Sequence, residues 1–169
     1  MIKNRRVKYK GFLSIEELDV ETKSGETVQR EVMVRPDAVS ALVYDTIKDR
    51  YILVSQFRPG ASQDVVEIVA GTLDHPGEDP VEAMKREILE EIGYETDSIE
   101  KISEFYVSPG GNTEKLTVYY CEVSNQIEEG GGLASENEEI DILYLEMDQL
   151  NPELFMDAKT IIAISWLYS

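Results

Sequence analysis

The sequence predicts a single α+β domain in which most strands precede one well-defined helix. Residues rich in β-branched and aromatic side chains form short runs at 28–34, 38–44 and 51–57, with turn residues between them. A helix pattern follows over residues 79–93. No internal repeat or linker divides the 169 residues, which are enough to bury one sizeable core. We therefore expect residues 1–169 to form one domain.

The expected strands are placed by their turns as much as by their apolar residues. Residues 20–22 and 28–34 flank a polar turn, which predicts a hairpin. Residues 38–44 and 51–57 are separated by a second polar turn, and residues 65–69 form a further short strand. The remaining strand-like runs lie after the helix, at residues 99–107, 116–123 and 140–145.

Both ends of the expected helix carry residues that helix ends favour. Asp79 can act as the N-cap, Pro80 suits the first helical position, and Gly93 suits the left-handed residue after the last turn. A second helix is expected over residues 157–167. Between the two, residues 128–139 form a long acidic loop, and loops of this length are uncommon unless they are functional or disordered.

The chain is strongly acidic, with 16 Lys and Arg against 34 Asp and Glu and a net charge of −18. Such a charge repels nucleic acid and anionic membranes, so we expect neither as a partner. The only cysteine, Cys121, has no partner for an internal disulfide, which favours a reducing compartment. The basic N-terminus has no apolar run behind it, and no apolar stretch is long enough to span a bilayer. We therefore expect a cytoplasmic protein.

Three carboxylates gather on one side of the expected helix. Glu87 and Glu91 are four residues apart and lie one above the other, with Glu90 in the next column. Four apolar residues form a stripe about a quarter turn away: Val81, Met84, Ile88 and Ile92. Like charges in one place are costly unless a cation joins them, and oxygen ligands alone favour Mg²⁺ or Mn²⁺ over zinc. Helix geometry alone leaves open a solvated acidic face, in which Arg86 pairs with Glu82 or Glu90.

The order of residues 78–94 resembles the Nudix box. That box reads Gly-x5-Glu-x7-Arg-Glu-U-x-Glu-Glu-x-Gly-U, where U is an aliphatic or bulky apolar residue. Glu78, seven further residues, and then Arg86-Glu87-Ile88-Leu89-Glu90-Glu91-Ile92-Gly93-Tyr94 fit this order. One departure is Gly71, which lies seven residues before Glu78 where the family pattern has six. The loop before the helix thus holds one extra residue, which leaves the helix register untouched.

The resemblance extends over most of the chain, to the branch of ADP-ribose and nucleoside-diphosphate-sugar pyrophosphatases. The segments that are similar to that branch lie at residues 30–32, 56–58, 67–71, 108–114, 132–140 and 157–168. The resemblance implies the Nudix fold, an α/β/α sandwich with a mixed β-sheet and an N-terminal antiparallel strand extension. It also implies a homodimer in which strands from residues 1–36 are exchanged.

The same resemblance assigns roles to residues that match the family motifs. The metal ligands would be the carbonyl of Ala70 and the carboxylates of Glu87, Glu91 and Glu138. The catalytic residues would be Glu136 as the general base, Glu90 as a neighbouring acid, and Arg86, which orients the carboxylates. Substrate would be contacted by Arg30, Glu31, Arg58, Glu114 and Lys159. Gly71, Glu78 and Gly93 would be structural, with Glu78 paired to Arg86. We expect Phe12 to be a core aromatic, with base stacking as the alternative.

Together these matches to the family imply a hydrolase that uses more than one Mg²⁺ or Mn²⁺ ion to cleave the diphosphate bond of a nucleoside diphosphate sugar. ADP-ribose, which would give AMP and ribose 5-phosphate, is the first expectation, and GDP-mannose or a UDP-sugar is the alternative. A non-catalytic nucleotide-binding module on the same scaffold is a further alternative, although the intact Glu87, Glu90 and Glu91 argue against it. The net charge also argues against long RNA as a substrate.

Overall fold

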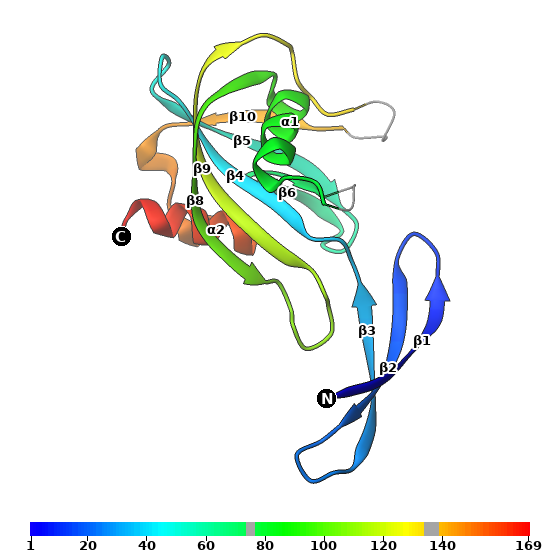
Figure 1. The fold of residues 1–169 in the computed structure, drawn as a ribbon. Helices are drawn as coiled ribbons and strands as arrows, with labels where there is room; N and C mark the ends of the chain where they lie inside the picture. Colours follow the sequence, from blue (N-terminus) through cyan, green and yellow to red (C-terminus); the bar gives the residue numbers. More distant parts are fainter. Residues whose placement is uncertain (74–76, 134–138) are drawn as a thin grey trace. The chain divides into compact units, whose positions relative to one another are not determined.

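The computed structural model describes residues 1–73, 77–133 and 139–169, which form two units (Figure 1). The smaller unit consists of Met1–Asp37 and Phe105–Leu116. The larger unit consists of Ala38–Glu104 and Thr117–Ser169. None of the helices within the described ranges is long and apolar enough to cross a membrane.

The smaller unit is built on a three-stranded antiparallel sheet in the order β1-β2-β3. Its strands are β1 (Ile2–Lys10), β2 (Ser14–Glu21) and β3 (Thr27–Val34). The predicted hairpin is present between β2 and β3, where Gly25 takes a φ of 84° that a side chain rarely adopts. The unit also includes the loop after β8, because the Met33 amide donates to the Gly111 carbonyl at 2.8 Å.

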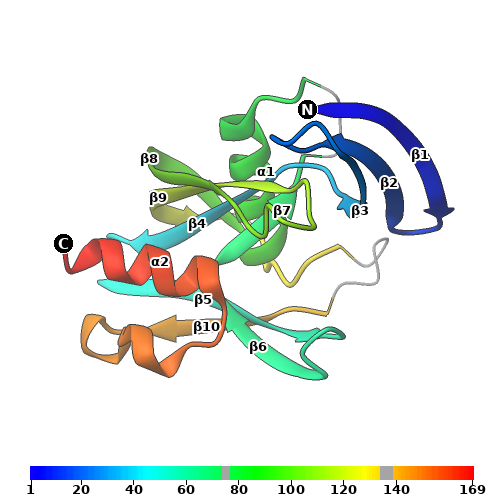
Figure 2. The ribbon, with the colours of Figure 1, turned by 90° about the horizontal axis from the view of Figure 1, so that it is seen from below.

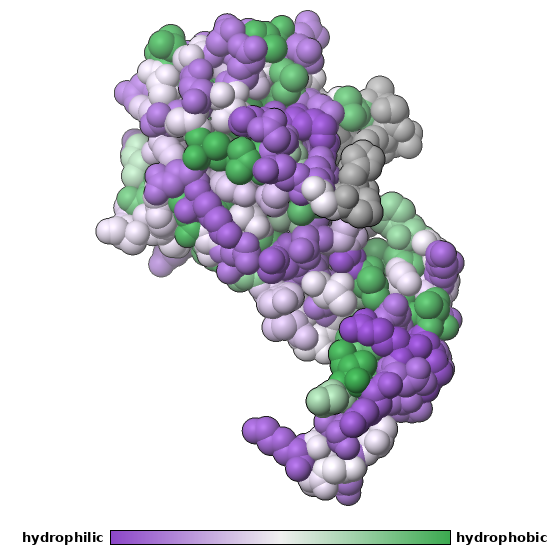
Figure 3. All heavy atoms as spheres, viewed as in Figure 1, coloured by the Kyte–Doolittle hydropathy of each residue, from purple (hydrophilic) through white to green (hydrophobic). Residues whose placement is uncertain are grey.

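Strand β1 was not predicted, because its sequence is almost entirely polar. Its basic side chains pair across the sheet with acids of β2: Arg6 lies 2.9 Å from Glu17 and 2.6 Å from Asp19. Cross-strand charge pairs, rather than an alternating apolar pattern, thus stabilise this strand. Phe12, between β1 and β2, is fully exposed, so the expectation of a core aromatic was wrong. Figure 3 shows apolar patches that interrupt the hydrophilic surface of this small sheet.

The larger unit contains a seven-stranded sheet whose main path runs β10-β5-β4-β9-β8. The strands on this path are β4 (Ala38–Asp45), β5 (Arg50–Arg58), β8 (Tyr94–Tyr106), β9 (Lys115–Gln126) and β10 (Asp141–Leu145). Strand β4 is central and almost wholly buried, which fits its continuous apolar run. Apart from residues 65–69, the strands predicted in this region are present; β8 begins before its expected start, and β9 extends beyond both of its expected ends.

The single strand expected at residues 65–69 is in fact two strands with different partners. Strand β6 (Gln63–Glu67) pairs with β5, whereas β7 (Val69–Thr72) pairs with β4. Ile68 lies between them, and its amide donates to the Thr160 hydroxyl at 2.9 Å instead of joining a strand ladder. The break between the two strands thus coincides with a hydrogen bond to a residue 92 positions away, which apolar periodicity alone could not reveal.

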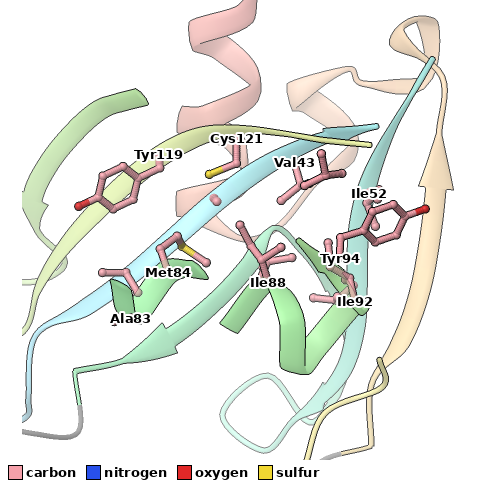
Figure 4. Close-up of a cluster of buried hydrophobic side chains, with 14 of the residues drawn as sticks. Val43, Ile52, Ala83, Met84, Ile88, Ile92, Tyr94, Tyr119 and Cys121 are labelled. Atoms are coloured by element: carbon pink, nitrogen blue, oxygen red, sulfur yellow. The ribbon is translucent and has the colours of Figure 1, made fainter. Parts of the chain in front are cut away.

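The two α-helices in the described part of the chain lie on opposite faces of the large sheet (Figure 2). Helix α1 (Pro80–Ile92) packs on β7 and β4, and α2 (Ala158–Leu167) packs on the other side of β4. Met84, Ile88 and Ile92 of α1 are completely buried against the sheet (Figure 4). The predicted α+β class and α/β/α sandwich, with a mixed sheet and an N-terminal antiparallel extension, are therefore confirmed.

Candidate active site

Helix α1 begins and ends as its capping residues predict. Asp79 has extended backbone angles and accepts a hydrogen bond from the Val81 amide at 2.8 Å, while Pro80 occupies the first turn. Gly93 takes the left-handed conformation, with a φ of 78°, and its amide donates to the Leu89 carbonyl at 2.9 Å. These ends fix the register of the helix, and thereby which carboxylates face the sheet.

Two carboxylates of helix α1 are buried against the backbone of β7. Glu87 is 9% exposed and Glu91 is 4% exposed. The Ala70 amide donates to Oε2 of Glu91 at 3.4 Å. At Gly71 a methyl group would lie 1.9 Å from Cδ of Glu87, so only glycine leaves room for that carboxylate. The structure therefore brings together Ala70, Gly71, Glu87 and Glu91.

Arg86 lies at the centre of a set of ion pairs on the same helix. Its Nη1 is 2.8 Å from Glu87 and 3.0 Å from Glu90, and its Nη2 is 3.5 Å from Glu78. Burial lowers the pKa of Arg86, but the three carboxylates outweigh it and raise the pKa overall. The alternative partner Glu82 pairs with Lys85 instead, at 2.8 Å. Arg86 thus restrains the carboxylates next to Glu91.

The donors at this place suit a hard divalent cation. Carboxylate oxygens and backbone carbonyls are the ligands that Mg²⁺ and Mn²⁺ prefer. Gly71 leaves space for the carboxylate of Glu87, and this is a second observation in favour of a cation site here. Within the described ranges, no three Asp, Glu, His or Cys side chains are close enough to hold a metal ion by themselves. The predicted base Glu136 and the predicted ligand Glu138 lie outside the described residues.

A glycine-rich segment after β9 binds the C-terminal end of α1, and sequence reasoning assigned it no role. The Gly131 amide donates to the Glu91 carbonyl at 2.8 Å, and the Gly132 amide donates to the Glu90 carbonyl at 3.1 Å. Carbonyls in the last turn of a helix lie beyond the reach of the regular amide four residues on, and the glycine amides donate to two of them. Gly130 and Gly131 have φ values of 72° and 101°, which explains the run of glycines. The acidic loop is therefore anchored at its start to the helix that carries Glu87 and Glu91.

The predicted substrate residues Arg58 and Lys159 meet at one buried carboxylate, Glu67. Arg58 donates from Nε and Nη2 to the two oxygens of Glu67, at 2.6 and 2.9 Å. Lys159 of α2 donates to Glu67 and lies 3.1 Å from Asp157. Sequence reasoning gave Glu67 no role, although it begins the segment 67–71 that resembles the family.

The other predicted substrate residues lie in the smaller unit. Arg30 and Glu31 are exposed on β3, and Arg30 donates to the Gln29 carbonyl at 2.8 Å. Glu114 follows the glycine turn after β8 and lies 3.4 Å from Arg35. It also accepts a hydrogen bond from the Asn112 side chain at 3.2 Å. The contacts of these residues are therefore defined within their own unit.

Comparison with known proteins gives the family. The NUDIX domain model matches residues 34–164, which is more than half of the chain. A methanol dehydrogenase activator from Bacillus methanolicus is 35% identical over 153 residues, covering 88% of this chain and 81% of that protein. A GDP-mannose pyrophosphatase from Escherichia coli (strain K12) is 32% identical over 161 residues, covering 88% of this chain and 83% of that protein.

A solved structure, described as the crystal structure of an ADP compounds hydrolase, shares the fold of the whole chain. It superposes with a TM-score of 0.81 at 20% identity, and the match covers 99% of this chain and 91% of that one. The family match spans the capped helix, the carboxylates Glu87 and Glu91, and the strand β7 that faces them. The chain therefore belongs to the Nudix family of hydrolases.

Proposed function

We propose that this protein hydrolyses the diphosphate bond of a nucleoside diphosphate sugar and requires Mg²⁺ or Mn²⁺. The observation that carries the proposal is the burial of Glu87 and Glu91 against the backbone of Ala70 and Gly71. Buried carboxylates on one helix face are costly unless a cation joins them. Relatives named as GDP-mannose pyrophosphatases support a diphosphate-linked sugar as the substrate.

In the proposed site, Glu87, Glu91 and the Ala70 carbonyl hold metal, with Glu138 as a further ligand and more than one ion in total. Bound divalent ions neutralise the diphosphate and polarise the phosphorus centre. Arg86 keeps Glu87 and Glu90 in place through its ion pairs, and Glu78 holds Arg86 from the other side. Gly71 leaves the space that the carboxylate of Glu87 requires.

The proposed chemistry is an in-line displacement by water. Glu136 accepts a proton from water as its oxygen bonds to phosphorus, and the bridging bond to the leaving phosphate breaks. Arg58 contacts the diphosphate and neutralises part of its charge through charge-assisted hydrogen bonds. Glu114, Arg30 and Glu31 contact the nucleoside or sugar parts, and Lys159, which donates to Glu67 beside Arg58, contributes to phosphate binding. For ADP-ribose the products would be AMP and ribose 5-phosphate.

A substrate panel tests the proposal. ADP-ribose, GDP-mannose, UDP-glucose and NADH would each be incubated with the protein and Mg²⁺ or Mn²⁺, and the products separated by chromatography. We expect a nucleoside monophosphate and a sugar phosphate from at least one of them, ADP-ribose first and GDP-mannose as the alternative. A metal chelator should abolish the turnover. Stability of all four compounds with either metal would refute the proposal.

Two carboxylate variants separate metal binding from proton transfer. Glu91→Gln should lose most activity and weaken Mn²⁺ binding while the fold survives, because a neutral amide is a poor ligand for a hard cation. Glu136→Gln should lower turnover but leave Mn²⁺ binding intact, and Glu139→Gln is its matched neighbour in the same loop. Loss of activity in Glu139→Gln with a silent Glu136→Gln would show that another acid is the base.

We also propose that the protein is a homodimer assembled through residues 1–36. The smaller unit contains more than half of the basic residues but fewer than a quarter of the acidic ones. Its sheet also exposes apolar side chains, namely Ile2, Val7, Tyr9 and Phe12. Because its charges nearly balance, the partly apolar surface on one copy would meet little repulsion from the acidic larger unit of another. Light scattering during size-exclusion chromatography should give a dimer mass, and a monomer at micromolar concentration would contradict this.

A regulatory module is the second candidate, because one relative is named as an activator of methanol dehydrogenase. The same substrate panel distinguishes the two functions. A module that only binds nucleotide would bind ADP-ribose or GDP-mannose, measured by calorimetry, without releasing a nucleoside monophosphate. Release of products at a rate that depends on Glu91 would instead establish the enzyme.

A further inference from the structure

Glu67 is a buried carboxylate that holds two of the expected substrate-binding cations. It ends strand β6, and its side chain is only 5% exposed. Arg58 reaches it from the adjacent strand β5, and Lys159 reaches it from helix α2. A buried carboxylate is tolerated where charged hydrogen bonds replace its water, and Glu67 receives them from both cations.

The contact between Glu67 and Arg58 leaves part of the guanidinium for a second anion. Glu67 accepts hydrogen bonds from Nε–H and from one N–H of Nη2, which lie along one edge of the guanidinium group. An arginine has five N–H groups, and two parallel ones on Nη1 and Nη2 match two oxygens of a phosphate. Arg58 is 41% exposed although Glu67 is buried, so the same side chain has one anchored edge and an accessible region.

The charges of this pair reinforce each other. Burial raises the pKa of Glu67, but hydrogen bonds and charge from Arg58 and Lys159 outweigh it and lower the pKa overall. The hydrogen bonds that Arg58 donates to Glu67 raise the pKa of Arg58 despite its burial. Both groups are therefore ionised at neutral pH, which keeps their two hydrogen bonds charge-assisted.

Helix α2 fixes Glu67 from its other side. Lys159 is only 14% exposed and is itself held by Asp157, which also accepts from the Thr160 amide at 3.0 Å as the helix cap. The Thr160 hydroxyl accepts from the Ile68 amide, directly after Glu67. Glu67 is thus restrained through its side chain and through its neighbouring backbone, so the direction of the Arg58 side chain is restrained as well.

We propose that Glu67 is a positioning residue that orients Arg58 toward the diphosphate of the substrate, with Lys159 acting through Glu67. The proposal rests on the proposed function, in which Arg58 contacts the diphosphate. The proposed role falls on Glu67, which lies outside the Nudix box and acts without contacting the substrate. It also explains why the fold places a lysine of α2 in contact with this carboxylate rather than with water.

Glu67→Gln distinguishes positioning from charge by the direction of the change. If Glu67 acted only through its charge, its loss would lower the KM, because an anionic substrate would lose a repulsive neighbour. If Glu67 orients Arg58, the variant should lose about one charged hydrogen bond between Arg58 and the substrate. The KM should then rise about tenfold, and kcat should change little. Glu82→Gln, an exposed acid paired with Lys85, is the matched control and should leave both constants unchanged.

A double-variant cycle tests whether Glu67 acts through Arg58. Arg58→Ala alone should raise the KM at least as much as Glu67→Gln does. The double variant should have the same KM as Arg58→Ala alone. Lys159→Met should likewise add nothing to Glu67→Gln. A lower or unchanged KM in Glu67→Gln, or increases that multiply in the double variant, would overturn the proposal.

Nuclear magnetic resonance of the arginine Nε–H groups gives a readout that is independent of turnover. In the full-length protein, the Arg58 Nε–H should be protected from exchange and should lose this protection in Glu67→Gln but not in Glu82→Gln. Titration with inorganic pyrophosphate should show binding about tenfold weaker in Glu67→Gln. Equal protection or equal affinity would overturn the inference. Weakened pyrophosphate binding without turnover of any nucleotide sugar would support it and count against the proposed function.

Discussion

Gly71→Ala is the sharpest test of the metal site, because it changes no ligand and leaves the charge of the protein unaltered. A methyl group at this position would lie 1.9 Å from Cδ and 2.1 Å from Oε1 of Glu87. Gly71 does not have a positive φ, so alanine adds no backbone strain. The substitution should therefore act on the position of one carboxylate.

The size of the effect follows from the overlap. An ordinary contact of this kind begins near 3.4 Å, so Cδ of Glu87 must retreat by about 1.5 Å. Because Glu87 has a flexible side chain, a change of rotamer can supply this movement at a cost of about 1 kcal/mol. A displacement of about 1 Å in a reacting group commonly reduces rates about 100-fold, so we expect kcat/KM to fall by that order. Weaker Mn²⁺ binding should accompany the loss.

The assay combines kinetics, Mn²⁺ binding followed by electron paramagnetic resonance, and thermal unfolding. Gly60→Ala is the matched control, because Gly60 has no neighbour within 4 Å of an added methyl group and lacks a positive φ. Gly71→Ala should unfold within a few degrees of the unaltered protein, as expected for a change of about 1 kcal/mol. Unaltered Mn²⁺ affinity and activity in Gly71→Ala would refute the argument that Glu87 requires this space.

Three further predictions concern other parts of the fold. Gly93→Ala combines a φ of 78° with a methyl group 2.1 Å from a backbone oxygen, so denaturant unfolding should show a loss of about 3 kcal/mol. Gly25→Ala, with a similar φ but no close neighbour, should lose less. Burial raises the pKa of Cys121 to about 12, so a thiol reagent at pH 8 should react only after unfolding. Because the pKa of Glu67 is lowered in the folded state, its stabilisation is present above its unfolded pKa and lost as pH falls through the folded pKa. Unfolding measured from pH 7 downward should therefore show a weaker pH dependence in Glu67→Gln.

The sequence predicted the reactive helix accurately because its signals are local. Asp79 and Gly93 set the ends of α1, and spacing within the helix then placed Glu87 and Glu91 on the same face. Residue spacing could not show which part of the fold packs against this face of α1. The contact of Glu87 with Gly71 depends on β7, and the residue between β6 and β7, Ile68, donates a hydrogen bond to Thr160 far along the chain.

The features that sequence reasoning missed share a physical cause, since each depends on partners that lie apart in the chain. Strand β1 is polar, and only its pairing with the acids of β2 identifies it as a strand. The glycines at 130–132 read as part of a long acidic loop, but the Gly131 and Gly132 amides donate to carbonyls at the end of α1. Glu67 reads as one more acid in an acidic protein, and its burial emerges only when β5, β6 and α2 come together.

This difference explains why the reaction is easier to predict than the substrate. The proposed metal ligands Glu87 and Glu91 are one helical turn apart, so a short segment determines their relative position. The proposed substrate contacts are supplied by separate strands, a glycine turn and helix α2, and each is oriented by neighbours such as Glu67 or Arg35. A change in any one of these neighbours can redirect a substrate contact without altering the Nudix box. Specificity in this chain should therefore be sought first in residues such as Glu67, which hold the contacts in place, and only then in the contacts themselves.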